Sequence, residues 1–361
     1  MLGFKKKIKI KHLVKQHLKI LKALQYPSGL FAASKKNIST GYNKAWLRDN
    51  FYECLAFEIL RDYKTVEKTY SAILEIFKKH EYKIDLAIKQ KPQYTYEYIH
   101  PRYNPETFDE FWEEWGNKQN DAIGCILFKI GELQHHKKFK ILKTKQDYKI
   151  IQKLVDYLSS IEYWQDQDSG MWEEDQEVHA SSVGACLAGL KMISKLKKIK
   201  VPKDILKKGQ EALNKLLPRE SDKKFVDLAL LSLIWPYNIT NKIQTKEILK
   251  NIEYHLLRKK GVIRYKSDRY YNKNPDSISE EAEWTFGLSW LSIIYGKLNE
   301  KRKQEQFYEL TKQTISSKGT IPELYFSNTS IPNKNNPLGW SESLFIIALY
   351  EMNQKHFKNL R

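Results

Sequence analysis

The chain has 361 residues, of which 41% are hydrophobic, enough to bury a sizeable core. No stretch approaches the ~20 uninterrupted apolar residues of a membrane span, and Lys and His interrupt the basic N-terminal segment too often for a secretory signal. The formal net charge is +19, but 53 of the 62 basic residues are Lys and they are spread along the chain, which argues against specific nucleic-acid binding.

The basic N-terminal segment is most simply a solvated first helix; the alternative is an amphipathic helix that touches a membrane or a partner. The three cysteines, Cys54, Cys125 and Cys186, each lie in an apolar run with helical spacing. We expect them to be core residues rather than disulfide partners or zinc ligands, since no CxxC or HExxH motif is present. This cysteine usage favours a reducing, cytoplasmic location.

Apolar residues recur with helical periodicity along nearly the whole chain, and alternating strand patterns are rare. Gly and Pro fall mostly between the periodic runs, and no low-complexity linker divides them, so we expect a single domain over residues 1–361. The pattern predicts twelve helices, near residues 9–25, 45–63, 65–79, 117–134, 147–162, 178–196, 203–216, 224–236, 243–257, 279–297, 300–315 and 340–356.

Motifs rich in Trp, Tyr and carboxylates occur just before or at the start of the even-numbered predicted helices. They read GYNKAWLRDN, FWEEWGNKQND, SGMWEEDQEVH, SEEAEWTFG and NPLGWSES, whereas the eighth helix has only KFVDLALL with Asp227. The even-numbered helices are also rich in small and apolar residues, as an inner ring that is buried on all sides requires. The sequence therefore predicts an all-α (α/α)6 barrel whose parallel inner helices gather these motifs at one mouth.

This mouth has the composition of a carbohydrate site, because Trp and Tyr rings stack on sugar faces while Asp, Arg and Asn bind hydroxyls. Glycoside hydrolysis needs a protonated carboxylic acid and a second carboxylate. Glu173 lies between Trp172 and Glu174, and a ring beside a like charge would raise its pKa, as a general acid requires. Glu323 lies in the long loop before the last helix. The carboxylates of these segments are Asp49, Glu113, Glu114, Asp121, Glu173, Glu174, Glu283 and Glu323.

Nine segments, in order, resemble the glucoamylase family of inverting α-glucosidases, glycoside hydrolase family 15, and the related N-terminal domain of the phosphorylase kinase α and β subunits. The resemblance runs from about Leu24 to Ala348. Each segment alone would be a weak indication of the family, but nine segments in the same order over a chain of this length make a specific resemblance. The segments read SGLFAAS, AWLRDN, WGNKQNDA, GMWEE, HASSVGACLAGL, RYKSDRYY, EEAEWTFG, IPELY and PLGWSESL.

The resemblance implies a single displacement with inversion, without a metal or an organic cofactor. Glu173 would be the general acid and Glu323 the general base that activates water, with the two carboxyl groups roughly 6.5–9.5 Å apart. Arg48 and Asp49 would bind hydroxyls of the terminal glucose, and Glu174 would contact the sugar on the leaving-group side. The other residues expected to bind the substrate are Trp46, Trp115, Gln119, Asp121, Trp172, Arg264 and Trp340.

The substrate so implied is the non-reducing end of an α-glucan or a maltooligosaccharide. The segments SGLFAAS, HASSVGA and PELYF lie closer to the phosphorylase kinase branch, so a non-catalytic, glucan-binding or regulatory domain is the alternative. Hydrolysis of α,α-trehalose is a third possibility. The sequence leaves the linkage (α-1,4, α-1,6 or trehalose) and the oligomeric state open.

Overall fold

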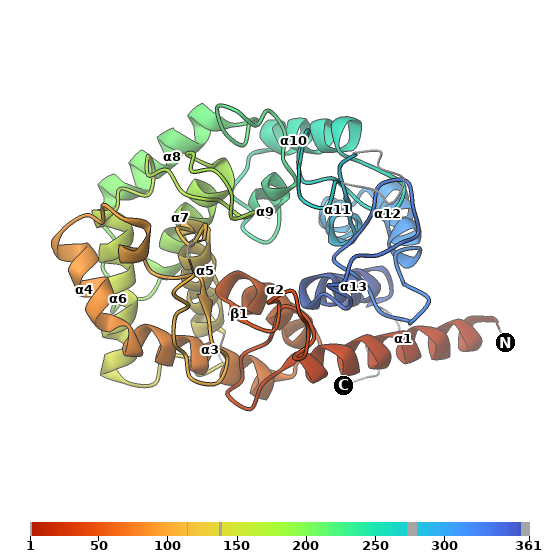
Figure 1. The fold of residues 1–361 in the computed structure, drawn as a ribbon, viewed down its shortest axis with the longest axis horizontal. Helices are drawn as coiled ribbons and strands as arrows, with labels where there is room; N and C mark the ends of the chain where they lie inside the picture. Colours follow the sequence, from red (N-terminus) through yellow and green to blue (C-terminus); the bar gives the residue numbers. More distant parts are fainter. Residues whose placement is uncertain (1, 114, 137–138, 273–279, 355–361) are drawn as a thin grey trace.

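The helices of the computed structural model form two concentric rings (Figure 1). The structure describes residues 2–113, 115–136, 139–272 and 280–354, with side chains from Ile10 onward. The inner ring contains α2 (Leu47–Ile59), α5 (Asn120–His135), α7 (Ala180–Ile193), α9 (Leu231–Ile234), α11 (Phe286–Lys297) and α13 (Gly339–Met352). The outer ring contains α1 (Leu2–Leu24), α3 (Tyr63–Lys79), α6 (Lys145–Ser160), α8 (Lys203–Leu216), α10 (Lys242–His255) and α12 (Lys301–Lys312).

Every inner helix contacts both of its neighbours, and α13 packs against α2 to close the ring. The fold is therefore an (α/α)6 barrel, as the sequence predicts. The three cysteines are buried and none of them forms a disulfide, which agrees with their prediction as core residues. In the part of the chain that the structure describes, no helix combines the length and apolarity needed to cross a bilayer.

Two elements differ from the prediction. An additional helix, α4 (Glu81–Lys89), begins directly after α3 and packs against α3 and α6. The eighth predicted helix is much shorter than residues 224–236: a 3₁₀ turn, η2 (Leu228–Leu230), leads into the four residues of α9. Asp227 caps this element by accepting a hydrogen bond from the Ala229 N–H at 2.7 Å, so the helix cannot extend backward as predicted.

The bounds of two further helices also differ from the predicted ones. The helix predicted over residues 279–297 begins only at Phe286, because Glu283–Trp284 form strand β3 and pair with Leu324–Tyr325 of β4. The last helix ends at Met352, and the final part of its predicted range lies outside the described residues.

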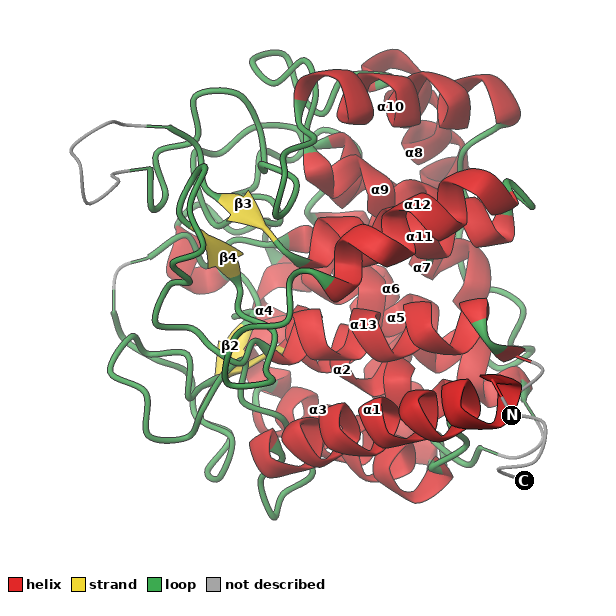
Figure 2. Cartoon of the chain, turned by 90° about the vertical axis from the view of Figure 1, so that its right-hand side faces the viewer, coloured by secondary structure: helices red, strands yellow, loops and turns green. Residues whose placement is uncertain are grey.

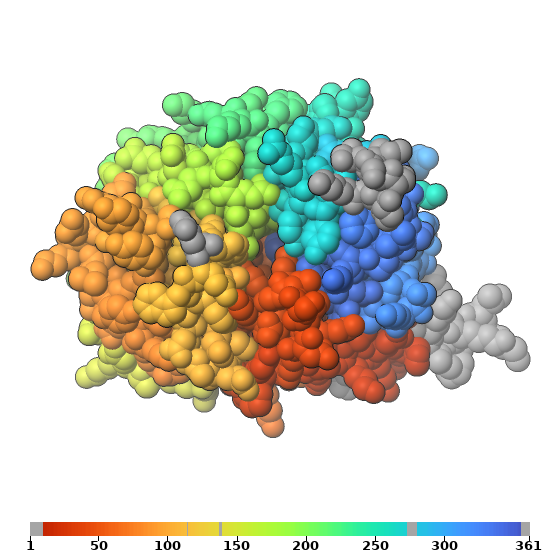
Figure 3. All heavy atoms as spheres, in the orientation of Figure 1, coloured from red at the N-terminus to blue at the C-terminus, as the bar shows by residue number. Residues whose placement is uncertain are grey.

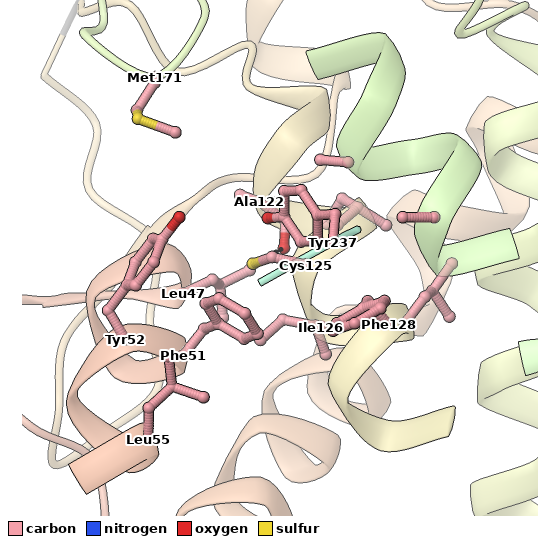
Figure 4. Packing of buried hydrophobic residues seen from close by; sticks show 14 of the residues in the cluster. Leu47, Phe51, Tyr52, Leu55, Ala122, Cys125, Ile126, Phe128, Met171 and Tyr237 are labelled. Atoms are coloured by element: carbon pink, nitrogen blue, oxygen red, sulfur yellow. Dashed lines mark hydrogen bonds between the residues drawn. The ribbon is translucent and has the colours of Figure 1, made fainter. Parts of the chain in front are cut away.

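Close contacts between inner helices depend on small residues. A Cβ atom on Gly124 of α5 would lie 2.5 Å from the backbone of Ala185 on α7, so a side chain there would push the two helices apart. Between α2 and α5, larger residues fill the space: Leu47 and Phe51 lie against Cys125 and neighbouring side chains (Figure 4). The inner helices are consequently buried around most of their circumference.

The outer helices expose one face to water, and α3, α6 and α10 begin at polar side-chain caps. Asp62 accepts a hydrogen bond from the Thr65 N–H at the start of α3, and Thr144 with Asp147 forms a capping box at the start of α6. These side chains satisfy N–H groups that have no partner within the helix.

The long loops lie on one side of the barrel, at the N-terminal ends of the inner helices (Figure 2). Two short antiparallel pairs tie these loops together. Strand β1 (Ala45–Trp46) pairs with β2 (Arg102–Tyr103), and β3 pairs with β4 in the register Glu283 with Tyr325. The loops before different inner helices are thus joined around the mouth of the ring.

A buried pair links α1 to this side of the barrel. His17 Nδ1 contacts Glu342 Oε2 with both side chains fully buried, and Glu342 Oε1 accepts the Ile321 N–H at 2.8 Å. We expect His17→Ala to lower the free energy of unfolding by about 3 kcal/mol, because it leaves a buried carboxyl oxygen without its partner. Urea unfolding measures this loss. The matched variant His12→Ala, at an exposed position of the same helix, should change it by less than about 0.5 kcal/mol, and equal effects would contradict the prediction.

Candidate active site

A pocket of about 260 Å³ lies at the loop end of the barrel. Segments from widely separated parts of the chain meet around the centre of this face (Figure 3). All predicted site residues line the pocket except Gln119 and Asp121. Its walls are formed by Ala33, Tyr42, Trp46, Arg48, Asp49, Trp115, Met171, Trp172, Glu173, Glu174, Arg264, Tyr270, Trp284, Phe286, Glu323, Leu338 and Trp340.

Glu173 lies at the tip of the loop before α7. Paired backbone hydrogen bonds between Asp168 and Glu177, at 2.9 and 3.0 Å, close this loop at its base. Glu173 itself has a φ of 66°, a left-handed conformation that a non-glycine residue adopts at a cost of about 1–3 kcal/mol. Gly116 of the WGNKQND motif allows the loop to approach, since a Cβ atom there would lie 2.6 Å from the Glu173 carbonyl oxygen. The conformation of this carboxylate is therefore imposed by its surroundings.

The electrostatic environment of Glu173 favours its protonated form. Burial raises its pKa to about 8, outweighing the nearby guanidinium of Arg48, whose Nη2 lies 3.3 Å from Oε1. The negative charge that adds to this increase belongs to Asp49, whose own pKa is raised to about 6 by burial. The side chain of Glu173 remains 21% exposed, so it faces the pocket rather than the core.

The position of Glu174 corrects one part of the sequence argument. Its carboxylate is bound by Arg264 Nη2 at 2.6 Å and by Lys224 Nζ at 3.3 Å, and Tyr265 also donates to it. Although burial alone would raise the pKa of Glu174, these partners hold it below its usual value. The charge of Glu174 is thus compensated, and Asp49, which is distant in sequence, is the like charge that acts on Glu173.

Glu323 is held by three neutral donors. Tyr42 donates to Oε1 at 2.9 Å, while the side-chain amides of Asn333 and Asn335 donate to Oε2 at 2.5 and 2.8 Å. Burial raises the pKa of Glu323, and the two amides and the hydroxyl oppose this increase. A carboxylate has roughly four lone-pair sites, so three donors leave capacity for one further proton donor such as water.

Arg48 and Asp49 occupy the first turn of α2, and both line the pocket. Gln119 and Asp121 lie behind Arg48: its Nη1 donates to Gln119 Oε1 at 2.9 Å and to Asp121 at 3.0 Å. These two predicted site residues therefore orient the guanidinium and do not line the cavity. Arg48 Nη2 is directed toward Glu173 on the pocket side.

Aromatic rings form most of the remaining wall. Trp340 stacks between Phe286, at 4.6 Å, and Tyr52, at 4.1 Å between ring centres. The indole N–H of Trp172 donates to Asp227 Oδ1 at 2.8 Å, which fixes this ring and gives Asp227 of the exceptional eighth segment a role. Rings that are held in this way form a rigid apolar wall that needs no further ordering when a ligand binds.

Sequence reasoning missed several residues at this site. Tyr42 and Trp284 lie within the quoted aromatic motifs, and Tyr270 lies in RYKSDRYY. Their aromatic character and their place in these motifs are therefore a sequence signal that they belong to the site. Asn333 and Asn335 lie in an ordinary polar loop, which carries no such signal. Among the described residues, no three His, Cys, Asp or Glu side chains come together in a way that could hold a metal ion.

Two other candidate carboxylates have different surroundings. Glu113 is mostly exposed at the rim and pairs with Lys44 and Arg102. Glu283 is buried and accepts backbone N–H groups, including that of Asn328 at 2.8 Å, so it supports the β3–β4 region. Glu114 lies outside the described residues.

Solved structures with a similar fold include several glycosidases. A wild-type glycosidase superposes with a TM-score of 0.81 at 16% identity, covering 96% of this chain and 98% of that one. A bacterial glucoamylase complexed with acarbose gives 0.72 at 15% identity, covering 95% of this chain and 55% of that one. At these identities the likeness shows the fold, the (α/α)6 barrel described above.

The family model for glycosyl hydrolases family 15 matches residues 8–281, a range that includes Glu173 and ends before Glu323. The chain belongs to glycosyl hydrolase family 15. An uncharacterized glycosyl hydrolase of Methanocaldococcus jannaschii is 27% identical over 271 residues, 64% of this chain and 42% of that protein. The liver isoform of the phosphorylase b kinase regulatory subunit alpha from Mus musculus is 26% identical over 390 residues, 89% of this chain and 31% of that protein. The chain spans less than half the length of these two relatives.

Proposed function

We propose that this protein is an inverting glycoside hydrolase that releases glucose from the non-reducing end of an α-glucan or a maltooligosaccharide. The observation that supports this most is that Glu173 and Glu323 line one pocket in two different environments. Burial raises the pKa of both carboxyl groups: that of Glu173 reaches about 8, which suits an acid, whereas at Glu323 three hydrogen-bond donors oppose the increase, which suits a base.

In the proposed reaction, Glu173 donates its proton to the glycosidic oxygen as the bond from that oxygen to the anomeric carbon breaks. A water molecule attacks the anomeric carbon from the opposite face and loses a proton to Glu323, so the product is β-glucose. Arg48 and Asp49 bind hydroxyls of the terminal sugar, and Glu174, fixed by Arg264, lies at the leaving-group side. The carboxyl separation of roughly 6.5–9.5 Å that inversion requires stays a prediction.

The second candidate function is a non-catalytic, glucan-binding or regulatory domain. It is supported by the phosphorylase b kinase regulatory subunits, which match 84–89% of this chain. Hydrolysis of α,α-trehalose is the third candidate, since the same pocket size suits any terminal glucose.

The cytoplasmic location also stays a prediction.

Proton NMR of fresh reaction mixtures distinguishes these candidates, because it detects the anomer before mutarotation. We expect β-glucose as the first product from glycogen, in a parallel series with maltose, isomaltose and trehalose. Maltose and isomaltose also release their reducing-end glucose, whose anomers are already mixed, and trehalose releases one β- and one α-glucose, so the anomer is scored on glycogen. First release of α-glucose from glycogen would contradict inversion. Binding of maltose without hydrolysis of any of the four substrates would favour the regulatory alternative, and cleavage of trehalose alone would favour the third.

A further inference from the structure

A second cavity, of about 890 Å³, lies beside the pocket, between α4 and the segments 90–97, 110–113 and 115–117. We call it the α4 groove; α4 is labelled at the edge of the ring in Figure 1. We propose that the α4 groove binds a stretch of α-glucan chain outside the catalytic pocket. This inference rests on the proposed function for the class of its ligand, a neutral polysaccharide.

Exposed rings gather at this groove. Trp112 is 100% exposed, Tyr96 is 64% exposed and Tyr82 is 62% exposed, although all three line a concave surface. Tyr94, which lies outside the groove lining, stacks on Tyr96 with ring centres 5.5 Å apart and planes only 6° apart, and so supports the Tyr96 ring. Uncovered apolar side chains in one cluster mark a binding surface, and flat rings suit the C–H faces of sugars.

Most charges of the groove are paired, which favours a neutral ligand; among the described residues, the exposed Lys89 is a lining cation without an ion pair. Lys83 pairs with Glu110 at 2.7 Å, Lys91 pairs with Glu162 at 3.1 Å, and Glu113 is held by Arg102 and Lys44. An anionic partner would have to compete with these carboxylates for the ammonium groups. Neutral hydrogen-bonding side chains complete the lining, namely Gln90, Gln93, Thr95 and Asn117. Rings beside neutral hydrogen-bonding groups fit a polyhydroxy chain better than a phosphorylated or acidic one.

The groove and the candidate active site share one wall residue, Trp115, which lines both cavities. This ring is fixed from several sides. The Arg102 guanidinium lies 4.2 Å from its centre, the His100 ring is nearly parallel at 6.1 Å, and Trp46 packs edge-on at 6.1 Å. The pocket, about 260 Å³, accommodates only the end of a glucan, so the rest of a long chain lies outside it. A rigid wall shared with an aromatic groove gives that remainder a place to bind.

Affinity electrophoresis in gels that contain glycogen tests the proposal without requiring catalysis. All proteins carry Glu173→Gln, so that glycogen is not consumed. We expect the double variant Tyr96→Ala/Trp112→Ala to bind glycogen about fivefold more weakly or worse, because two stacking faces are lost. The double variant Tyr96→Phe/Trp112→Phe should retain most of the affinity. The matched control is Tyr254→Ala, an 82% exposed ring on α10, which should not change it.

Three outcomes would overturn the proposal. The first is that the parent protein does not bind glycogen, and the second is that the double alanine variant binds it as tightly as Tyr254→Ala does. The third is that the double phenylalanine variant loses as much affinity as the double alanine variant. If the glycogen affinity does not change when the two rings are removed, the groove would instead be assigned to a protein partner.

The experiments also distinguish failure of the hydrolase proposal from failure of the groove proposal. If maltose is not hydrolysed by the wild type but glycogen affinity depends on the rings, only the hydrolase proposal fails. If maltose is hydrolysed but the rings do not matter, only the groove proposal fails.

Discussion

Replacement of Glu173 by Gln is expected to lower kcat/KM for maltose by about 10²–10⁴-fold, the usual contribution of a general acid. The amide keeps the size of the side chain but cannot donate a proton to the leaving oxygen. Steady-state glucose release measures the effect. With α-glucosyl fluoride, whose leaving group needs little protonation, the loss should be much smaller. A variant that loses both activities equally would show that Glu173 acts in binding or folding rather than as the acid.

The pH dependence gives an independent test of the same residue. The raised pKa of Glu173, about 8, predicts that the wild-type kcat/KM falls above pH 8 as the acid loses its proton. The folded state binds this proton more tightly than the unfolded state, so the stabilising effect of protonation is present at pH 4 and lost as pH rises through about 8. Glu173→Gln should therefore raise the Tm relative to wild type more at pH 9 than at pH 5. The matched variant Glu113→Gln, at the exposed rim carboxylate, keeps Glu173, so its kcat/KM should still fall above pH 8, but its Tm should not rise relative to wild type more at pH 9 than at pH 5.

Replacement of Glu323 by Ala is expected to cause a loss of similar size, about 10²–10⁴-fold in kcat, because no group remains to accept a proton from water. Azide needs no deprotonation and fits the space left by the carboxylate. Added azide should therefore restore turnover and yield β-glucosyl azide, which NMR identifies.

The control for this variant is Glu280→Ala. Glu280 hydrogen-bonds the Ser327 side chain at 2.7 Å in the same loop region but lies outside the pocket. It should retain wild-type turnover and show no response to azide. If azide instead gives the α-azide, or if Glu323→Ala is fully active, Glu323 is not the base.

The architecture was accessible from the sequence because two signals coincide. Helical periodicity gave the number of ring helices, and the repeated Trp-rich motifs marked which helix ends share the mouth. The exceptions have local causes: α4 follows α3 without a break that composition reveals, and α9 is cut short by the cap at Asp227. Such local hydrogen bonds override a weak helical propensity.

The site was only partly accessible for a different reason. A sequence shows neighbours along the chain, and it suggested Glu174 as the charge that acts on Glu173. In space, Arg264 compensates Glu174 and Asp49 supplies that charge, a relation between segments more than 120 residues apart. The amides of Asn333 and Asn335 resemble those of any polar loop until the fold brings them to Glu323.

Closure of the ring by α13 against α2 has a consequence for the newly made protein. Tyr52 of α2 stacks on Trp340, so a chain still on the ribosome exposes this ring until α13 has emerged. At about 5–20 residues per second, synthesis of the intervening segment takes roughly tens of seconds. Throughout that interval the incomplete barrel exposes apolar surface of its inner helices, the kind of surface that chaperones bind on newly made chains.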